Sequence, residues 1–367
     1  MQPKDFLNPK IKKLPPYSLN SEVDLSNIKI KLDANESFLE LPGHIQSEAL
    51  AGLHEIKFNR YPDPSAASLI KKFADYLNAR ENTGLTPDNI AAGNGTDELL
   101  NIIINAFVSK NDKMLVFEPD FSMYAFYGQI IEAGILRLQK KDLKINWSEA
   151  ADVLKRENIK LALFSNPCNP TGQLENKADI IKFINLAREC GAVVVLDEVY
   201  MSFCGGRNSL LHEFLEYPNL IIMKSLSKSI GLAALRVGFA LSNADFINAV
   251  KTIKSPFNLN AVSQKLAETV LGYPDYLEEN LKTITQNKKE LQEELSKIFT
   301  VHPTETNFVL AESAHSGEIF EYLLKNGILV RKLSEKYLRI TSGSAEENKE
   351  LLKCLKLKYQ DKPKKQK

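Results

Sequence analysis

The chain has 367 residues, of which 44% are hydrophobic and 25% charged, and its formal net charge is +1. This composition is that of an ordinary globular protein, and the length favours two domains over one. A net charge this small gives no reason to expect binding to nucleic acid or to a membrane surface through bulk electrostatics. No stretch approaches the roughly 18 apolar residues of a membrane span, and the first residues lack the apolar run of a signal peptide. We therefore expect a cytoplasmic protein.

Cysteine and histidine usage argues against metal chemistry. The four cysteines form no C-x-x-C pair, and none has a histidine at metal-ligand spacing. Isolated cysteines of this kind are typical of small core residues in a reducing compartment. The five histidines also lack a partner at motif spacing. We expect neither a metal site nor a catalytic histidine.

The first part of the chain predicts an arm and then a helical segment. Residues 1–30 carry prolines and mixed charge without periodicity, which is typical of an arm on the surface or against a partner. A short alternating strand follows and runs into polar residues at 33–36. Two prolines predict a loop over 58–64. Apolar residues at helical spacing between Leu69 and Leu77 predict the next helix.

Residues 90–100 contain a glycine turn before a buried helix. Two glycines precede Thr96, which we interpret as the helix N-cap, with two acidic residues in the first turn. Such a turn presents free backbone N–H groups at a position suited to phosphate. The third glycine of a dinucleotide-binding fingerprint is missing. On its own, this motif is at least as well explained as a structural turn.

Short apolar runs then alternate with helical patterns, which predicts an α/β layer with a mostly parallel sheet. The predicted strands are 113–117, 161–164, 192–196, 220–223 and 237–241, with helices between the first four. The carboxyl ends of such strands carry functional residues. Three of these strands are followed by an aromatic or polar group: Phe121, Asn169, and Asp197 with Tyr200.

The fourth strand ends in the most informative stretch. Ser225, Ser227 and Lys228 follow its apolar run, and Arg236 lies eight positions after the lysine. Burial disfavours an ammonium group, and lysines perturbed in this way are typical Schiff-base formers. The hydroxyls and the arginine would bind an anion, which suits a phosphorylated aldehyde. Taken alone, the motif would also fit a strand-to-loop turn with solvated cations.

Beyond about residue 260 the pattern predicts a smaller α+β domain. A long charged amphipathic helix is expected over 275–298, and short strands and helices follow it. We therefore expect four parts: an arm (1–35), a large domain (36–262), a small C-terminal domain (263–358) and a basic tail (359–367).

Together these residues match the needs of one cofactor, pyridoxal phosphate. It requires a lysine, an anion beside its pyridine nitrogen, donors for its ring oxygen, an aromatic face, and an anion-binding corner for its phosphate. The order and spacing resemble the class I and II aminotransferases, pyridoxal-phosphate enzymes of fold type I, over residues 31–352. The resemblance implies a three-layer α/β/α large domain with a mostly parallel mixed sheet, and a smaller C-terminal α+β domain.

The resemblance also implies roles for individual residues. Lys228 would be the Schiff-base lysine, Asp197 would pair with the pyridinium, and Asn169 and Tyr200 would bind the ring oxygen. Phe121 would stack on the ring. The phosphate would be held by Gly95, Thr96, Asp97, Ser225, Ser227 and Arg236. Tyr61 would reach the phosphate of a neighbouring subunit, which implies a homodimer with a shared active site.

Within the family, the motifs at 32–37, 60–63, 93–98 and 338–343 are similar to the branch that acts on histidinol phosphate with 2-oxoglutarate, in histidine biosynthesis. By this resemblance the substrate would be bound by Arg339, Tyr17, Asn35 and Arg331. Tyr17 is followed by Ser18-Leu19 where the branch usually has proline-glycine, and Ser37 replaces a proline. The loop at the mouth of the site is therefore expected to be shaped differently.

Other functions remain open at the level of sequence. The same framework serves decarboxylases of threonine phosphate or serine phosphate, and aminotransferases for other phosphorylated or aromatic amines. The orientation of the bond to be cleaved distinguishes them, and sequence does not show it. A pyridoxal-binding regulator would need a DNA-binding domain, for which we expect no room before Leu32.

Overall fold

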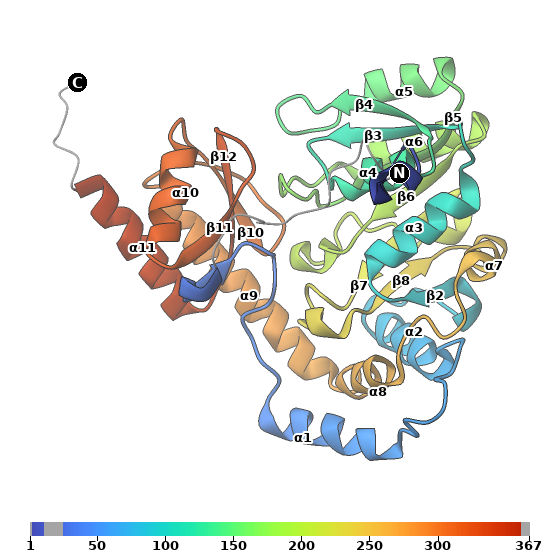
Figure 1. The fold of residues 1–367 in the computed structure, drawn as a ribbon, viewed down its shortest axis with the longest axis horizontal. Helices are drawn as coiled ribbons and strands as arrows, with labels where there is room; N and C mark the ends of the chain where they lie inside the picture. Colours follow the sequence, from blue (N-terminus) through green and yellow to red (C-terminus); the bar gives the residue numbers. More distant parts are fainter. Residues whose placement is uncertain (1, 11–24, 361–367) are drawn as a thin grey trace.

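The computed structural model describes residues 2–10 and 25–360, and two β-sheets organise them (Figure 1). The larger sheet has seven strands. In spatial order they are β2 (Ile90–Gly93), β8 (Gly238–Leu241), β7 (Leu220–Ser225), β6 (Val193–Asp197), β5 (Ile159–Ser165), β3 (Lys113–Glu118) and β4 (Gly134–Gln139). Neighbouring strands from β7 to β4 are parallel, whereas β8 is antiparallel to both of its neighbours. The sheet is therefore mixed and mostly parallel.

Helices cover both faces of this sheet, which confirms the expected three-layer architecture. Successive side chains of a strand point to opposite faces, so Val193 and Val195 lie in one core while Val194 and Leu196 lie in the other. The first core includes α3 (Thr96–Phe107), α4 (Met123–Ile130) and α7 (Ala244–Ile253). The second includes α2 (Ala67–Glu81), α5 (Trp147–Arg156), α6 (Lys177–Glu189) and α8 (Ala261–Val270). Burial on both faces explains why the central strands are continuous apolar runs.

The smaller sheet has five strands and lies at the other end of the molecule (Figure 1). In spatial order they are β1 (Ile30–Leu32), β11 (Ile328–Lys332), β12 (Tyr337–Thr341), β10 (Phe308–Glu312) and β9 (Thr300–His302). Its core is completed by α9 (Pro274–Leu295), α10 (Ser316–Lys325) and α11 (Ala345–Gln360). Strand β1 pairs in parallel with β11, so part of the segment expected as an arm belongs to this sheet.

Helices α1 and α9 connect the two ends of the molecule. Helix α1 (Gly43–Gly52) packs against α8, and α9 runs from the region of α8 to the smaller sheet (Figure 1). Within residues 2–10 and 25–360, no helix is long and apolar enough to cross a membrane. The same ranges contain no group of three or more metal-ligating side chains.

Three local predictions were wrong or incomplete. Helix α3 begins at Thr96 with Gly95 as its N-cap, so Thr96 is not the capping residue. The chain between β6 and β7 forms only short 3₁₀ turns, at 201–204 and 214–216, instead of a helix. Two glycines at 205 and 206, both with positive φ, interrupt that segment. Strand β4 was missed because it is a half-exposed edge strand without a strong apolar run.

Candidate active site

A cavity of about 370 Å³ lies beyond the carboxyl ends of β3, β5, β6 and β7, and the smaller sheet closes its other side. Of the predicted site residues that the structure describes, all but Gly95 and Tyr61 line it. The lining includes Asn35, Thr96, Asp97, Phe121, Asn169, Asp197, Tyr200, Ser225, Ser227, Lys228, Arg236, Arg331 and Arg339. The structure therefore brings together side chains that are separated by up to 304 positions in the sequence, from Asn35 to Arg339.

Lys228 lies in the loop after β7 and points into the cavity. Its Nζ donates to the carbonyl oxygen of Ala34 at 3.1 Å and to that of Asn35 at 3.2 Å. The same nitrogen lies 5.8 Å from the centre of the Tyr200 ring. Two backbone carbonyls thus hold this primary amine at the wall of the cavity. Its position suits a nucleophile.

Asp197 is the last residue of β6 and is only 7% exposed. Burial raises the pKa of its carboxyl to about 7, although hydrogen bonds from the Tyr124 hydroxyl (2.8 Å) and the Val199 N–H (3.1 Å) act in the opposite direction. The charge of Asp120 raises this pKa further. A buried carboxyl of this kind is stabilised as an anion when a cation is placed beside it.

Tyr124 was not singled out from the sequence as a site residue. It is buried on α4, and its pKa lies well above the usual value because of burial and the neighbouring Asp197 carboxylate. Its hydroxyl therefore remains a hydrogen-bond donor to Asp197. The available signal was its position three residues after Phe121, since this spacing places two side chains on one face of a helical turn. The two rings pack edge to face, with centres 5.6 Å apart.

The N-terminus of α3 forms an anion-binding corner. Gly95, its N-cap, has φ of +85°, a conformation that favours glycine. A Cβ atom at this position would lie 2.6 Å from Nη2 of Arg236, so only glycine leaves space for the guanidinium. Asp97 lies 3.9 Å from the same nitrogen. A helix N-terminus with an adjacent guanidinium and the nearby hydroxyls of Ser225 and Ser227 is suited to a phosphate.

Asn35 holds the Tyr200 hydroxyl in place from the side of the smaller sheet. Its Nδ2 donates to Tyr200 Oη at 2.8 Å, and its backbone N–H donates to Thr341 Oγ1 at 3.0 Å. Asn307 donates to the Asn35 carbonyl oxygen at 3.1 Å. Asn35 is buried, with φ of +55°, which asparagine tolerates better than most residues. These hydrogen bonds fix Asn35 beside the cavity, and Asn35 in turn fixes the Tyr200 hydroxyl.

Two arginines reach the cavity from the smaller sheet, Arg331 on β11 and Arg339 on β12. Arg339 donates from Nη1 to Asn169 Oδ1 and from Nη2 to the Asp33 carbonyl oxygen, both at 2.6 Å. Its guanidinium also lies 5.4 Å from the centre of the Phe308 ring. The side of the cavity formed by the smaller sheet is therefore cationic and suited to an anionic substrate.

Two predicted residues do not line the cavity. Gly95 stands behind Arg236 without lining the cavity, as described above. Tyr61 is 81% exposed and stacks on Phe257, with ring centres 4.5 Å apart. Tyr17 lies outside the described residues.

An α/β/α layer with a strand-end lysine, a buried carboxylate and a phosphate corner defines a pyridoxal-phosphate enzyme of fold type I. Residues 27–355 match the family model of the class I and II aminotransferases, and the chain belongs to that family. It is a transaminase, and its cofactor is pyridoxal phosphate.

Individual relatives cover nearly the whole chain. A histidinol-phosphate aminotransferase from Clostridium novyi is 40% identical over 354 residues, which are 94% of this chain and 95% of the relative. A histidinol-phosphate aminotransferase from Clostridium kluyveri is 36% identical over 352 residues, which are 94% of this chain and 96% of the relative. The crystal structure of histidinol-phosphate aminotransferase from Sinorhizobium meliloti in complex with pyridoxal-5'-phosphate superposes with a TM-score of 0.85 at 22% identity, covering 96% and 98% of the two chains.

The residues present fit the cofactor. Asp197 offers a buried carboxyl whose pKa of about 7 leaves it ready to ionise beside a protonated ring nitrogen. Gly95 leaves open the space that a side chain would fill beside Arg236. Lys228 lines the same cavity as Asp197 and Arg236. The ring nitrogen, the phosphate and the aldehyde of pyridoxal phosphate thus each have a suitable group in this site.

Proposed function

We propose that the chain transfers the amino group of histidinol phosphate to 2-oxoglutarate, a step of histidine biosynthesis. The observation that carries this proposal is the pair of arginines, Arg331 and Arg339, that line the same cavity as Lys228. Histidinol phosphate brings a phosphate dianion, and 2-oxoglutarate brings two carboxylates. Both substrates would therefore need cationic groups on this side of the site. The names of the relatives support the same substrate.

Three residues of the chain would take part in moving the proton at Cα of the substrate: Lys228, Asp197 and Tyr124. When bound, pyridoxal phosphate supplies an electron sink for the electron pair left behind when a proton leaves Cα of the substrate. Lys228 would remove that proton and return it, because its amine lies in the cavity that would hold the substrate. Asp197 would keep the ring nitrogen protonated, and Tyr124 would hold the Asp197 carboxylate in place by the hydrogen bond already described.

The remaining predicted residues would bind and orient the cofactor and the substrate. Asn169 and Tyr200 would contact the ring oxygen, and Phe121 would cover the ring. The phosphate would be held at the corner formed by Gly95, Thr96, Asp97, Ser225, Ser227 and Arg236. On the substrate side we propose Arg331, Arg339, Asn35 and Tyr17. None of these roles requires a metal ion.

We further propose a cytoplasmic homodimer in which each subunit completes the site of the other. Tyr61 is supported as the shared residue because it is exposed and does not line the cavity of its own chain. Phe58, which is 79% exposed, and Phe257 lie close to it in sequence or in space. An exposed aromatic patch of this kind is typical of an interface. The division into a large domain (36–262) and a small domain (263–358) is also proposed, with β1 from the arm added to the smaller sheet.

The test is an absorbance spectrum of the yellow protein, mixed with one amine at a time. Histidinol phosphate or glutamate should bleach the visible band of the cofactor, and 2-oxoglutarate should restore it. If phosphothreonine or phosphoserine instead released carbon dioxide while the band returned, the protein would be a decarboxylase. If no band formed after pyridoxal phosphate was added, the cofactor assignment would be wrong.

A pair of variants on β11 separates the two substrates. Arg331→Gln should raise KM for histidinol phosphate more than KM for glutamate, because Arg331 is proposed to bind the phosphate. Lys332→Gln is the matched control, since Lys332 is adjacent on the same strand and pairs with Glu335. If both variants raised KM equally, the assignment of Arg331 would be wrong.

A further inference from the structure

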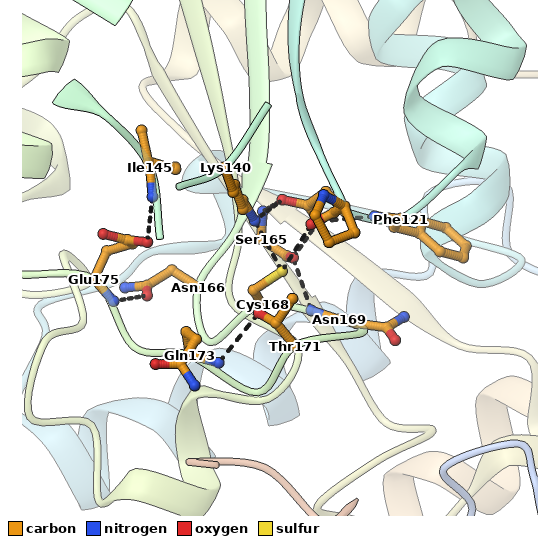
Figure 2. Close-up of polar contacts among 12 residues, drawn as sticks. Phe121, Lys140, Ile145, Ser165, Asn166, Cys168, Asn169, Thr171, Gln173 and Glu175 are labelled. Atoms are coloured by element: carbon orange, nitrogen blue, oxygen red, sulfur yellow. Dashed lines mark hydrogen bonds and ion pairs between the residues drawn. The ribbon is translucent and has the colours of Figure 1, made fainter. Parts of the chain in front are cut away.

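A buried charged cluster lies in the wall of the cavity, at the carboxyl ends of β5, β3 and β4, and the roles proposed above do not use it. Lys140 Nζ lies 3.0 Å from Asp120 Oδ2, and both side chains are only 1% exposed. The same nitrogen lies 2.9 Å from Cys168 Sγ, which in turn lies 3.6 Å from the Pro119 carbonyl oxygen (Figure 2). The cluster therefore joins the three loops that follow three adjacent parallel strands.

The Asp120 carboxylate is the centre of this cluster. Besides Lys140, it accepts a hydrogen bond from the backbone N–H of Phe121 at 2.8 Å. It also accepts the backbone N–H of Ser165 at 3.2 Å and the Ser165 hydroxyl. The Ser165 Oγ accepts the backbone N–H of Asn169 at 3.0 Å. One carboxylate thus connects the loop that carries Phe121 with the loop that carries Asn169.

Figure 2 shows the direction in which the side chains of Phe121 and Asn169 leave the cluster. The side chains of Phe121 and Asn169 extend to the same side, away from Glu175 and Ile145. Both line the cavity. They are the groups proposed above to cover the cofactor ring and to bind its oxygen, so their separation decides how the ring is held.

Stability alone does not explain a buried ion pair at this place. Taking two charges out of water is costly, and well-packed apolar residues of similar volume are often as stable or more stable. An apolar residue, however, could not accept hydrogen bonds from two different loops. Burial by itself would lower the pKa of Lys140, but the Asp120 charge and Cys168 outweigh it and raise that pKa. Lys140 therefore keeps its charge around neutral pH.

We infer that Asp120 and Lys140 are positioning residues, which fix Phe121 and Asn169 relative to each other and thereby set the geometry of the cofactor-ring site. Ser165 transmits this constraint from Asp120 to the Asn169 backbone. The inference rests on the proposed function of Phe121 and Asn169.

The experiment measures two properties of the cofactor site besides activity. One is the affinity of the cofactor-free protein for pyridoxal phosphate, followed by fluorescence titration. The other is the pH midpoint at which the visible band of the loaded protein changes. Lys140→Met should lower the affinity, because Phe121 and Asn169 would no longer be held at the separation that fits the ring. The midpoint should move to higher pH, because the ring oxygen keeps more electron density when the Asn169 donor is displaced.

A second variant removes the hydrogen bond between Ser165 and the Asn169 backbone and leaves the charges of Asp120 and Lys140 in place. Ser165→Ala keeps the Asp120–Lys140 pair but takes away the acceptor of the Asn169 N–H. It should shift both properties in the same direction as Lys140→Met, with little loss of stability. This variant decides the question if Lys140→Met does not fold.

The control is Lys113→Met, which breaks the 2.9 Å pair of Lys113 with Glu157 at the opposite end of β3. It should leave affinity and midpoint unchanged. The inference would be wrong if Ser165→Ala behaved like the wild type, or if Lys113→Met shifted both properties as much as Lys140→Met. If the wild type itself failed to bind pyridoxal phosphate, the proposed function would be wrong as well, so the two failures are distinguishable.

Discussion

The environment of Asp197 can be tested by measuring the free energy of unfolding as a function of pH. The change is Asp197→Asn in the cofactor-free protein. The wild-type carboxyl is buried, and its pKa is raised from 3.8 to about 7, chiefly by burial. Asparagine is nearly isosteric and neutral at every pH. Its carbonyl oxygen can still accept the Val199 N–H, and the Tyr124 hydroxyl can rotate to accept from its amide.

The sign and size of the effect follow from the two pKa values. In the unfolded chain the carboxyl ionises near 3.8, whereas in the folded chain it keeps its proton up to about pH 7. Between these values the folded state binds more protons, so the free energy of unfolding falls as the pH rises. At ~1.4 kcal/mol per pH unit, the full loss is ~4 kcal/mol and is complete just above pH 7. The asparagine variant lacks this loss.

Urea unfolding of both proteins across this pH range measures the difference directly. In acid, the free energy of unfolding of the variant should equal that of the wild type. As the pH rises, it should exceed the wild-type value by several kcal/mol, up to ~4. Asp75→Asn is the control, because Asp75 is an exposed carboxylate paired with Lys71 on α2. If the two stability curves ran parallel, burial would not hold the carboxyl in its protonated form, and the reasoning would be refuted. Pyridoxal phosphate should abolish the loss by supplying a cation beside Asp197.

Three further outcomes are expected. Lys228→Ala should abolish transamination in a keto-acid assay, and even about a tenth of wild-type activity would exclude its role as the reacting amine. Gly95→Ala should weaken binding of pyridoxal phosphate in a fluorescence titration, because its Cβ would meet Arg236 at 2.6 Å; Gly84→Ala, also at positive φ but in open space, should not. Phe239→Ala should lower the free energy of unfolding by ~3–5 kcal/mol, because the ring is fully buried and stacked on a second buried phenylalanine.

Residues at strand ends could be found from the sequence. Asp197 and Lys228 each follow an apolar run, and a charged group at that point stands out because burial is costly for it. The parallel order of the central strands then places their carboxyl ends at one edge of the sheet. Asn169 and Phe121 were found in the same way. This part of the site is a consequence of topology, which the alternation of strands and helices indicates.

Residues that act through another side chain gave no such signal. Tyr124 looks like a core aromatic in the sequence, and only the packing of α4 against β6 brings its hydroxyl to Asp197. Lys140 follows an edge strand that the pattern did not reveal, so its partner Asp120 looked like an ordinary loop carboxylate. Their roles depend on single contacts between residues far apart in the sequence, and hydrophobic periodicity does not predict such contacts.

The hydrogen bond between Arg339 and Asn169 connects the substrate side of the cavity to the cofactor side. Because Arg339 Nη1 donates to Asn169 Oδ1, the amide is fixed with its Nδ2 donor turned away from the arginine. A carboxylate or phosphate binds a guanidinium more strongly than two neutral oxygens do, through charge-assisted paired hydrogen bonds. A substrate anion at Arg339 would therefore compete with Asn169 Oδ1 and with the Asp33 carbonyl. The Asn169 backbone would still be held by Ser165, so the amide could adjust to the ring oxygen while its loop stayed in place. Substrate binding and the electronic state of the cofactor ring are thus expected to be coupled through a single asparagine.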